Sequence, residues 1–256
     1  MNRIERAIRE ARGDGPAIIA YLTAGYPRRE GFLATLGTVA QAADVVEIGV
    51  PFSDPMADGL TIQRSSRVAL GHGVSLGWLL AELAAARGSF RAPLLLMSYL
   101  NPLLAFGLEP LPAAATRAGI EGFIVPDLPL EESAELRQAL ARARISLVQF
   151  VAPTTPPART ARLCAASEGF VYALTMNGVT GKDAALPDAT MAYLARLRSS
   201  ATVPVCAGFG IRHRAQVAKL RPHVDGVIVG SALVEALERG EDPAAFLEGL
   251  RDRSDH

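Results

Sequence analysis

The sequence predicts an α/β protein that folds as a single (β/α)8 TIM barrel with an extra N-terminal helix. Short apolar runs rich in Val, Ile and Leu alternate with longer amphipathic segments, which is typical of a parallel sheet covered by helices. The runs are continuously apolar, as strands buried on both faces should be. The chain has 256 residues, and single barrels of this kind commonly have about 250.

Eight apolar runs are predicted strands: Ala17–Thr23, Val45–Gly49, Pro93–Met97, Gly122–Val125, Ser146–Val151, Phe170–Leu174, Val203–Ala207 and Gly226–Val229. The predicted helices between and after them are Arg29–Ala42, Leu76–Ala86, Pro110–Ala118, Glu131–Arg142, Pro157–Ser167, Ala189–Ser199, Arg212–Leu220 and Ala232–Arg239. The charged start Met1–Arg6 predicts the extra N-terminal helix, and acidic groups mark two further helix starts, at Glu131 and Asp188.

An open, doubly wound sheet is the alternative architecture, but eight strands in a chain of this length favour a closed barrel. The Gly208–Gly210 segment also lacks the third glycine of the dinucleotide-binding fingerprint G-x-G-x-x-G. No linker rich in Ser, Gly or Pro divides the chain, so residues 1–256 are expected to form one domain.

The composition narrows the function classes. Lys and Arg together number 26, as do Asp and Glu, which argues against a nucleic-acid or membrane-surface partner. Cys164 and Cys206 form neither a disulfide framework nor a C-x-x-C pair, so a reduced, cytoplasmic setting is expected. The N-terminus has no apolar signal-peptide region, and the apolar run Pro93–Tyr99 is too short to span a bilayer.

The segment Val46–Gly59 carries three acids where a predicted strand meets a loop rich in Gly and Pro. Glu47 lies near the end of the strand, and Asp54 and Asp58 follow in the loop. A buried carboxylate costs several kcal/mol unless it is paired or protonated, yet it suits proton-transfer chemistry. Asp54, within Ser-Asp-Pro, is better explained as a turn former.

Active sites of barrels gather at the C-terminal ends of the strands. The side chains expected there are Tyr21, Thr23, Glu47, Asp58, Asp127 and Tyr172, of which Asp127 is interpreted as bracing its loop. Three glycine-rich segments follow the last three strands: Gly178–Gly181, Gly208–Gly210 and Gly230–Ser231. Each could merely form a tight turn, but together they indicate a phosphate site, helped by a helix that starts near Ser231.

Elimination limits the chemistry further. The lysines, Lys182 and Lys219, lie in a loop and a surface helix, which disfavours a Schiff-base mechanism. The four histidines are scattered, so no metal site is expected, and neither His nor Cys forms a nucleophile pair. The chemistry that remains is acid–base catalysis by two carboxylates, which act on a small phosphorylated molecule without a metal or covalent cofactor.

The sequence resembles the tryptophan synthase alpha chain family over essentially its whole length. The resemblance rests on Ala20–Pro27, Glu47–Gly59, Leu96–Pro102, Asp127–Glu132, Gly178–Gly181, Gly208–Ile211 and Gly230–Ala232, and Glu47–Gly59 is its most specific part. It implies retro-aldol cleavage of indole-3-glycerol phosphate to indole and glyceraldehyde 3-phosphate. It also implies a beta-chain partner in an alpha2beta2 heterotetramer, with pyridoxal phosphate on the beta chain and no cofactor on this chain.

By the same resemblance, Glu47 is the general acid/base, and Asp58 hydrogen-bonds the indole N–H and stabilises the charge that develops there. The implied indole-pocket residues are Tyr21, Leu96, Tyr172, Thr180 and Phe209, and the implied phosphate binders are Gly181, Gly210, Gly230 and Ser231. The Asp54–Asp58 and Gly178–Pro187 loops are implied to be mobile lids facing the beta chain.

Two positions depart from the family pattern: Met176 replaces an Arg that some members carry, and Leu60 replaces a common Pro. The first puts one lid contact in doubt, and the second implies a less rigid loop after Asp58. Three alternatives remain: a stand-alone lyase that releases free indole, a non-catalytic phosphate-binding barrel, and another phosphate-binding barrel such as an isomerase. The last lacks support because the Glu47–Gly59 motif is not typical of it.

Overall fold

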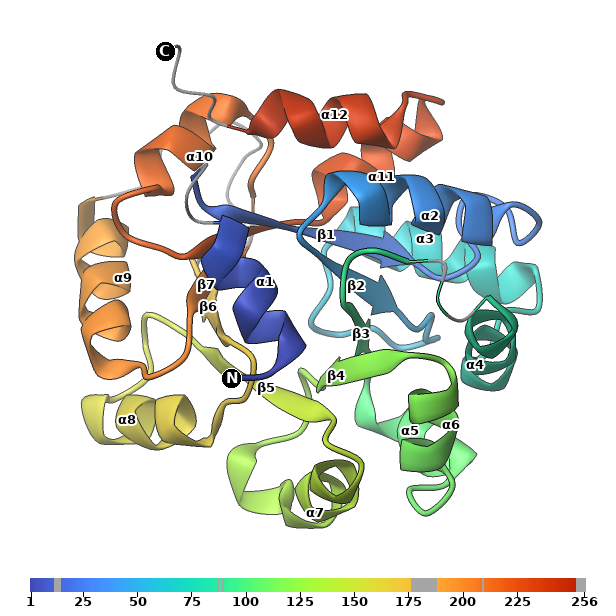
Figure 1. Ribbon diagram of the computed structural model, residues 1–256, viewed down its shortest axis with the longest axis horizontal. Coiled ribbons are helices and arrows are strands. Elements are labelled where there is room, and N and C mark those ends of the chain that lie inside the picture. The colour runs from blue at the N-terminus through green and yellow to red at the C-terminus, as the bar shows by residue number, and fades with distance from the viewer. Residues whose placement is uncertain (12–14, 87, 89, 176–187, 209, 252–256) are drawn as a thin grey trace.

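The computed structural model describes residues 1–11, 15–86, 88, 90–175, 188–208 and 210–251. Eight parallel strands form a closed barrel in which each strand pairs with the next and β8 closes on β1 (Figure 1). The strands are β1 Ala17–Thr23, β2 Val45–Gly49, β3 Leu94–Met97, β4 Ile120–Ile124, β5 Ser146–Val151, β6 Val171–Leu174, β7 Val205–Gly208 and β8 Gly226–Val229. The predicted barrel is therefore confirmed.

Four strands, β3, β4, β6 and β7, have boundaries that differ from the sequence prediction. β6 begins at Val171 rather than Phe170, β4 ends at Ile124 rather than Val125, and β7 extends to Gly208. β3 and β7 begin directly after Pro93 and Pro204, since proline has no N–H to donate to a neighbouring strand. Both prolines still accept bonds through their carbonyl oxygens, from Val46 N–H at 3.0 Å and from Val171 N–H at 2.8 Å. β4 begins two residues before Gly122, because Ile120 already pairs with Leu94 of β3.

Helices surround the barrel (Figure 1): α1 Arg3–Ala11, α2 Phe32–Ala42, α3 Leu60–Gly71, α4 Leu76–Ala85, α5 Leu100–Phe106, α6 Leu111–Arg117, α7 Ala134–Arg142, α8 Pro157–Ala166, α9 Asp188–Ser200, α10 Arg214–Leu220, α11 Ser231–Glu238 and α12 Pro243–Leu250. The predicted helix at 131–142 is instead a short 3₁₀ turn, Leu130–Glu132, followed by α7. The sequence prediction missed α3, α5 and α12. The buried face of α3 includes Ser65 and Ser66, so its apolar periodicity is weak.

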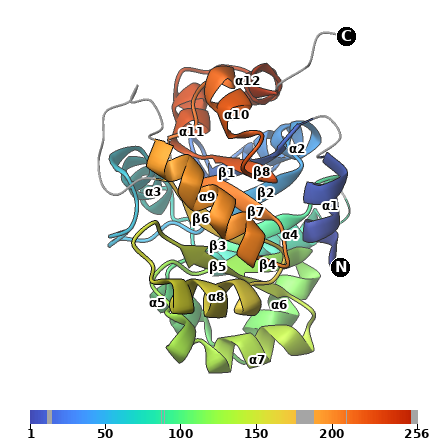
Figure 2. The same cartoon turned by 90° about the vertical axis from the view of Figure 1, so that its left-hand side faces the viewer.

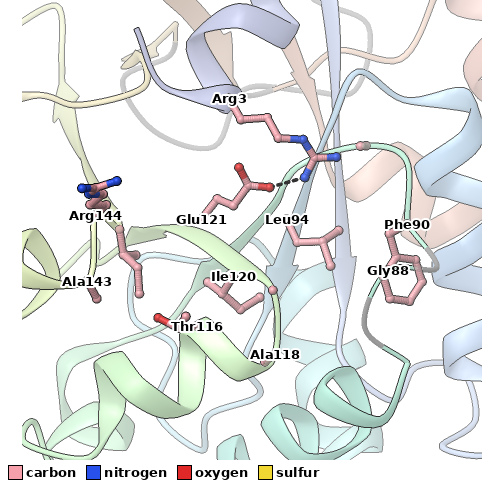
Figure 3. A pocket seen from close by; sticks show the side chains of 13 residues that line it. Arg3, Gly88, Phe90, Leu94, Thr116, Ala118, Ile120, Glu121, Ala143 and Arg144 are labelled. Atoms are coloured by element: carbon pink, nitrogen blue, oxygen red, sulfur yellow. Dashed lines mark hydrogen bonds and ion pairs between the residues drawn. The ribbon is translucent and has the colours of Figure 1, made fainter.

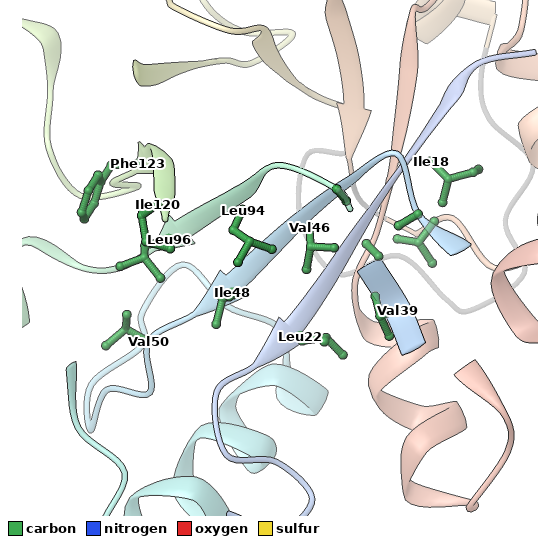
Figure 4. Packing of buried hydrophobic residues seen from close by; sticks show 14 of the residues in the cluster. Ile18, Leu22, Val39, Val46, Ile48, Val50, Leu94, Leu96, Ile120 and Phe123 are labelled. Carbon is green, nitrogen blue, oxygen red and sulfur yellow. The ribbon is translucent and has the colours of Figure 1, made fainter. Parts of the chain in front are cut away.

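Two apolar layers make up the core. The outer layer fills the space between strands and helices, and the inner one fills the barrel. Alternation along each strand assigns the layers: Figure 4 shows Val46 and Ile48 of β2 with Leu94 and Leu96 of β3 in the outer layer. The residues between them, Glu47 and Leu95, therefore face the interior. This alternation places Glu47 inside the barrel.

Helix α1 closes the N-terminal end of the barrel, at the opposite end from α3 (Figure 2). Ile4 and Ile8 are fully buried in the inner cluster. The side chain of Ile4 lies against two backbone positions without side chains: a Cβ atom at Gly122 would be 3.0 Å from it, and one at Gly169 would be 3.3 Å away. The extra N-terminal helix is therefore part of the core.

Replacing Ile8 with alanine is expected to lower the free energy of unfolding by about 2–5 kcal/mol, because the barrel end cannot collapse to fill the space. Urea unfolding followed by circular dichroism measures this. Arg6→Ala on the exposed face of the same helix is the control, and its effect should stay within about 0.5 kcal/mol. Equal effects of the two changes would show that α1 does not belong to the core.

Within the described part of the chain, no single helix is long and apolar enough to cross a membrane. Helices α3 and α4 pass a test of length and composition only as a pair, and the chain bends by 80° between them.

Candidate active site

Glu47 is an interior carboxylic acid without a visible partner. The third residue of β2, it pairs in register with Tyr21 of β1 and Leu95 of β3, and it is 0% exposed. Neither carboxyl oxygen has a hydrogen-bond partner among the described residues. Burial raises the pKa of Glu47 to about 8, because nothing offsets the loss of hydration of its charged form. Glu47 therefore holds its proton at neutral pH and can donate it.

Asp58 is the second acid of the site, and its environment is wetter. It lies in the loop before α3 and is partly exposed. Burial raises its pKa to about 6, although a hydrogen bond with the Tyr99 side chain acts in the opposite direction. Most Asp58 side chains are consequently ionised at pH 7. The two carboxyl groups therefore differ in charge at neutral pH, as an acid and an electrostatic partner should.

Three contacts hold the backbone around Asp58. The Tyr99 hydroxyl accepts a hydrogen bond from Ala57 N–H at 2.9 Å. Gln63 Nε2, in the first turns of α3, donates to the carbonyl oxygen of Asp58 at 2.8 Å, and Asp58 N–H donates to Pro55 at 3.1 Å. Neither Tyr99 nor Gln63 was a predicted site residue. The signal for Tyr99 was its place in the Leu96–Pro102 motif, directly after β3.

Two tyrosines, Tyr21 of β1 and Tyr172 of β6, lie near both acids. Burial raises the pKa of Tyr21 and of Tyr172, and the negative charges of both Glu47 and Asp58 raise each further. All four side chains therefore share the C-terminal part of the barrel. Phe150 packs against Tyr172 with ring centroids 4.6 Å apart, and it lines a cavity of about 280 Å³ at the C-terminal ends of β4, β5 and β6.

Each tyrosine lies across a glycine of the following strand. A Cβ atom at Gly49 would be 2.0 Å from the Tyr21 hydroxyl, and one at Gly208 would be 2.4 Å from the Tyr172 ring. In both pairs the glycine lies two positions beyond the residue paired with the tyrosine, on the neighbouring strand. The glycines thus leave the space that the two rings occupy.

Gly49→Ala is expected to displace the Tyr21 ring, lower the free energy of unfolding by about 1–3 kcal/mol and weaken binding at the site. Urea unfolding measures the first effect. The matched control is Gly37→Ala in α2, where an added Cβ meets no atom within 4 Å and helix propensity should stabilise the protein by up to about 1 kcal/mol. Stabilisation by both changes would contradict the packing of Tyr21 over Gly49.

The pKa of Glu47 also makes stability depend on pH. Because its pKa is raised from 4.5 to about 8 in the folded state, the folded protein holds this proton more tightly than the unfolded chain does. Its contribution to stability is complete below pH 4.5 and is lost as the pH rises towards 8, at about 1.4 kcal/mol per pH unit. Glu47→Gln cannot titrate. Urea unfolding should therefore show the variant gaining a few kcal/mol on the wild type between pH 5 and 8, and a constant difference would contradict the raised pKa.

A chain of hydroxyl groups joins β1 to α3. The Tyr21 hydroxyl lies 3.4 Å from Thr23 Oγ1, which lies 2.6 Å from Ser65 Oγ, and Ser65 donates to the carbonyl oxygen of Ile62 at 2.9 Å. The last bond fixes the direction, because Ser65 must then accept from Thr23 and Thr23 can accept from Tyr21. Buried Ser65 is therefore satisfied, and α3 is fixed against the strand that carries Tyr21.

The described parts of the predicted phosphate site lie beside these side chains. Gly230 faces the Tyr21 side chain, where an added Cβ would be 3.6 Å from Tyr21 Cβ and 3.8 Å from its ring, and it precedes Ser231, the first residue of α11. Val234 N–H makes the first bond of that helix, to Gly230, so the preceding N–H groups can face an anion. Gly210 has φ 78°, which favours glycine.

Other predicted residues are placed differently. Thr180, Gly181, Phe209, Met176 and the Gly178–Pro187 loop lie outside the described residues. Leu96 lies in the outer layer (Figure 4), and the structure does not bring it to the two acids; its neighbours Leu95 and Met97 face inward. Asp54 is exposed, and Asp127 accepts a hydrogen bond from Leu100 N–H at 2.9 Å, which braces the start of α5.

A cavity of about 380 Å³ opens at the opposite end of the barrel, beside the first residues of β3 and β4 (Figure 3). Arg3 of α1 forms an ion pair with Glu121 across it. Because barrel active sites lie at the C-terminal ends of the strands, this cavity is separate from the candidate site. Among the residues described, no group of three or more His, Cys, Asp or Glu side chains is placed to hold a metal ion.

Comparison with known proteins identifies the family. A family model described as tryptophan synthase alpha chain matches residues 9–251. The tryptophan synthase alpha chain of Nitratidesulfovibrio vulgaris strain Hildenborough is 44% identical over 254 residues, covering 98% of this chain and 99% of the relative. The chain belongs to the tryptophan synthase alpha chain family.

Solved tryptophan synthase structures share the fold. A structure of the Mycobacterium tuberculosis enzyme is 35% identical with a TM-score of 0.89, covering 97% of this chain and 96% of its own. The alpha subunit of Legionella pneumophila strain Paris is 29% identical with a TM-score of 0.87, and the match covers 99% of this chain and 98% of the Legionella chain. In this family the alpha chain is the lyase subunit that cleaves indole-3-glycerol phosphate, so the activity class that the sequence motifs implied is confirmed.

Proposed function

We propose that this chain cleaves indole-3-glycerol phosphate to indole and glyceraldehyde 3-phosphate, with Glu47 as the acid/base and Asp58 as the charge partner. One observation carries the assignment of roles: a fully buried carboxylic acid with a pKa of about 8 faces the barrel interior, and the loop after the same strand carries an acid with a pKa of about 6. At pH 7 the first holds a proton and most of the second is ionised, so one site contains both an acid and a negative charge.

The proposed reaction needs no group beyond these two. Protonated Glu47 donates its proton to C3 of the indole ring, and ionised Asp58 stabilises the positive charge that develops at the ring N–H. The Glu47 carboxylate then accepts the proton of the hydroxyl group on the adjacent glycerol carbon. The carbon–carbon bond breaks, its electron pair restores the indole ring, and the aldehyde forms. Glu47 ends the cycle protonated.

The substrate is proposed to lie between the tyrosines and the glycine segments. Tyr21 and Tyr172, with Thr180 and Phe209, would enclose the indole ring, whereas Leu96 would support strand β3 from the outer layer. Gly210, Gly230 and Ser231, with Gly181, would bind the phosphate. The support comes from the position of Gly230 next to the Tyr21 side chain, because it places the start of α11 close to the proposed indole pocket.

A tryptophan synthase beta chain is the proposed partner, in an alpha2beta2 heterotetramer with pyridoxal phosphate on the beta chain. Met56 and Leu60, which flank Asp58, are 92% and 79% exposed, as suits a surface that a partner covers. Leu60 is the first residue of α3, a position that also accepts proline. We further infer that residues 1–256 act as one domain in the cytoplasm.

The decisive experiment incubates the chain with indole-3-glycerol phosphate and follows indole release, with and without an added tryptophan synthase beta chain. Release that a beta chain strongly stimulates supports the two-chain enzyme. Full activity of the isolated chain would instead favour the stand-alone lyase. No indole under either condition would overturn the proposal and favour a non-catalytic barrel.

A further inference from the structure

One carboxylate joins three segments around the proposed site. Glu235 of α11 forms a two-point ion pair with Arg212, with Nη1–Oε2 and Nη2–Oε1 distances of 2.8 and 2.9 Å. Its Oε1 atom also accepts a hydrogen bond from Thr61 Oγ1 at 2.9 Å. The side chains of Arg212 and Glu235 are only 19% and 13% exposed, so this pair is better shielded from water than an ordinary surface pair.

The three segments carry different parts of the proposed chemistry. Arg212 lies two residues after Gly210, in the loop that follows β7. Glu235 lies one helical turn after Ser231 in α11. Thr61 is the second residue of α3 and follows Asp58 by three residues. Glu235 therefore connects two phosphate-binding segments with the segment that carries the charge partner of the indole N–H.

Further bonds hold these segments to the barrel. Gln216 of α10 accepts a hydrogen bond from Arg212 N–H at 2.7 Å and donates to the carbonyl oxygen of Gly210 at 3.1 Å, which fixes the loop after β7. The hydroxyl chain from Tyr21 to Ser65 fixes α3 against β1. Because both sides are anchored, the hydrogen bond between Thr61 and Glu235 joins two rigid parts of the proposed site directly.

We propose that Glu235 is a positioning residue of the retro-aldol reaction, which holds the phosphate-binding segments and the Asp58 segment at the spacing that the substrate requires. This inference rests on the proposed function. Binding energy from a remote phosphate raises turnover only if it positions groups at the reacting atoms. The connection from Arg212 through Glu235 to Thr61 links the loop that carries Gly210 with the segment that carries Asp58. Occupation of the phosphate site should therefore tighten binding of an indole ring beside Asp58.

The test uses Thr61→Val, which removes one hydrogen bond while leaving the Arg212–Glu235 pair and the size of the side chain nearly unchanged. The probes are inorganic phosphate and indole, and calorimetry measures the dissociation constant of indole with and without saturating phosphate. We expect phosphate to tighten indole binding about fivefold or more in the wild type and less than about twofold in the variant. The affinity for phosphate alone should stay within about twofold.

Turnover gives a second readout that a merely structural role would not change. Thr61→Val should lower kcat for indole-3-glycerol phosphate about fivefold with KM nearly unchanged, and Thr61→Ser, which keeps the hydroxyl group, should restore it. Arg64→Gln is the matched control, because Arg64 joins the same two helices through Glu238 at 2.8 and 2.6 Å, and among the described residues its hydrogen bonds do not include the loop after β7. Its indole–phosphate coupling should equal that of the wild type.

The possible failures are distinguishable. Wild-type coupling in Thr61→Val, or equal loss in Arg64→Gln, would overturn the positioning role even if the wild type releases indole normally. A wild type that makes no indole would instead overturn the proposed function, whatever the coupling between indole and phosphate.

Discussion

Replacing Glu47 with glutamine is expected to lower kcat for indole release by at least about 10³-fold while substrate still binds. The amide keeps the size of the side chain but cannot donate a proton to the indole ring or take one from the glycerol hydroxyl group. General acid–base catalysis contributes roughly 10²–10⁴-fold per proton transfer, and Glu47 is assigned two transfers. Single-turnover kinetics with indole-3-glycerol phosphate, together with its dissociation constant measured by calorimetry, separate chemistry from binding.

The control for this change is Glu121→Gln at the opposite end of the barrel. Burial also raises the pKa of Glu121, but its partner is Arg3 and it lies beside the separate cavity, away from the two acids (Figure 3). It should retain wild-type turnover. If Glu47→Gln keeps more than about a tenth of the wild-type kcat, the acid/base role belongs to another residue.

Asp58→Asn should lower kcat by about 10²–10³-fold, because a neutral amide stabilises a positive charge at the indole N–H far less than a carboxylate does. The pH profile supplies a sharper test. In the wild type, kcat/KM should rise as Asp58 ionises near pH 6 and fall as Glu47 loses its proton near pH 8. Asp58→Asn should lose the limb near pH 6 and keep the limb near pH 8.

Tyr99→Phe tests the same acid without removing it. The hydrogen bond from Tyr99 lowers the pKa of Asp58, so its loss should move the acidic limb above pH 6 while the basic limb stays in place. A profile in which Asp58→Asn retains the limb near pH 6 would assign that limb to a different group and contradict the proposed division between the two acids.

The strand pattern could be predicted from sequence because strands buried on both faces are continuously apolar between breaks. The sequence does not show, however, which side chains within such a run face inward and which face outward. Leu94, Leu95 and Leu96 are chemically identical, and only their places in the two apolar layers show that Leu95 faces inward and Leu96 outward. Continuous apolarity therefore identifies a strand but conceals its two faces.

The two acids could be predicted as site residues, because a buried carboxyl group is costly and needs a functional reason. The environment of each acid could not be predicted from the sequence. The hydroxyl group that lowers the pKa of Asp58 comes from Tyr99 and therefore depends on how β2 and β3 lie side by side. Helix α3 shows the same difficulty. Its buried Ser65 is satisfied by Thr23, 42 residues earlier, so a well-packed helix has only a weak apolar periodicity in its own sequence.

The packing of tyrosine over glycine has a consequence for engineering. Positions 21 and 49 share one volume, as do positions 172 and 208, so neither member of a pair can be enlarged alone. Libraries intended to accept substituted indoles should therefore vary each pair jointly, with a smaller side chain on one strand combined with a larger one on the next. Screening one position at a time would miss these combinations, because a larger residue at one position of a pair is damaging until the other position is made smaller.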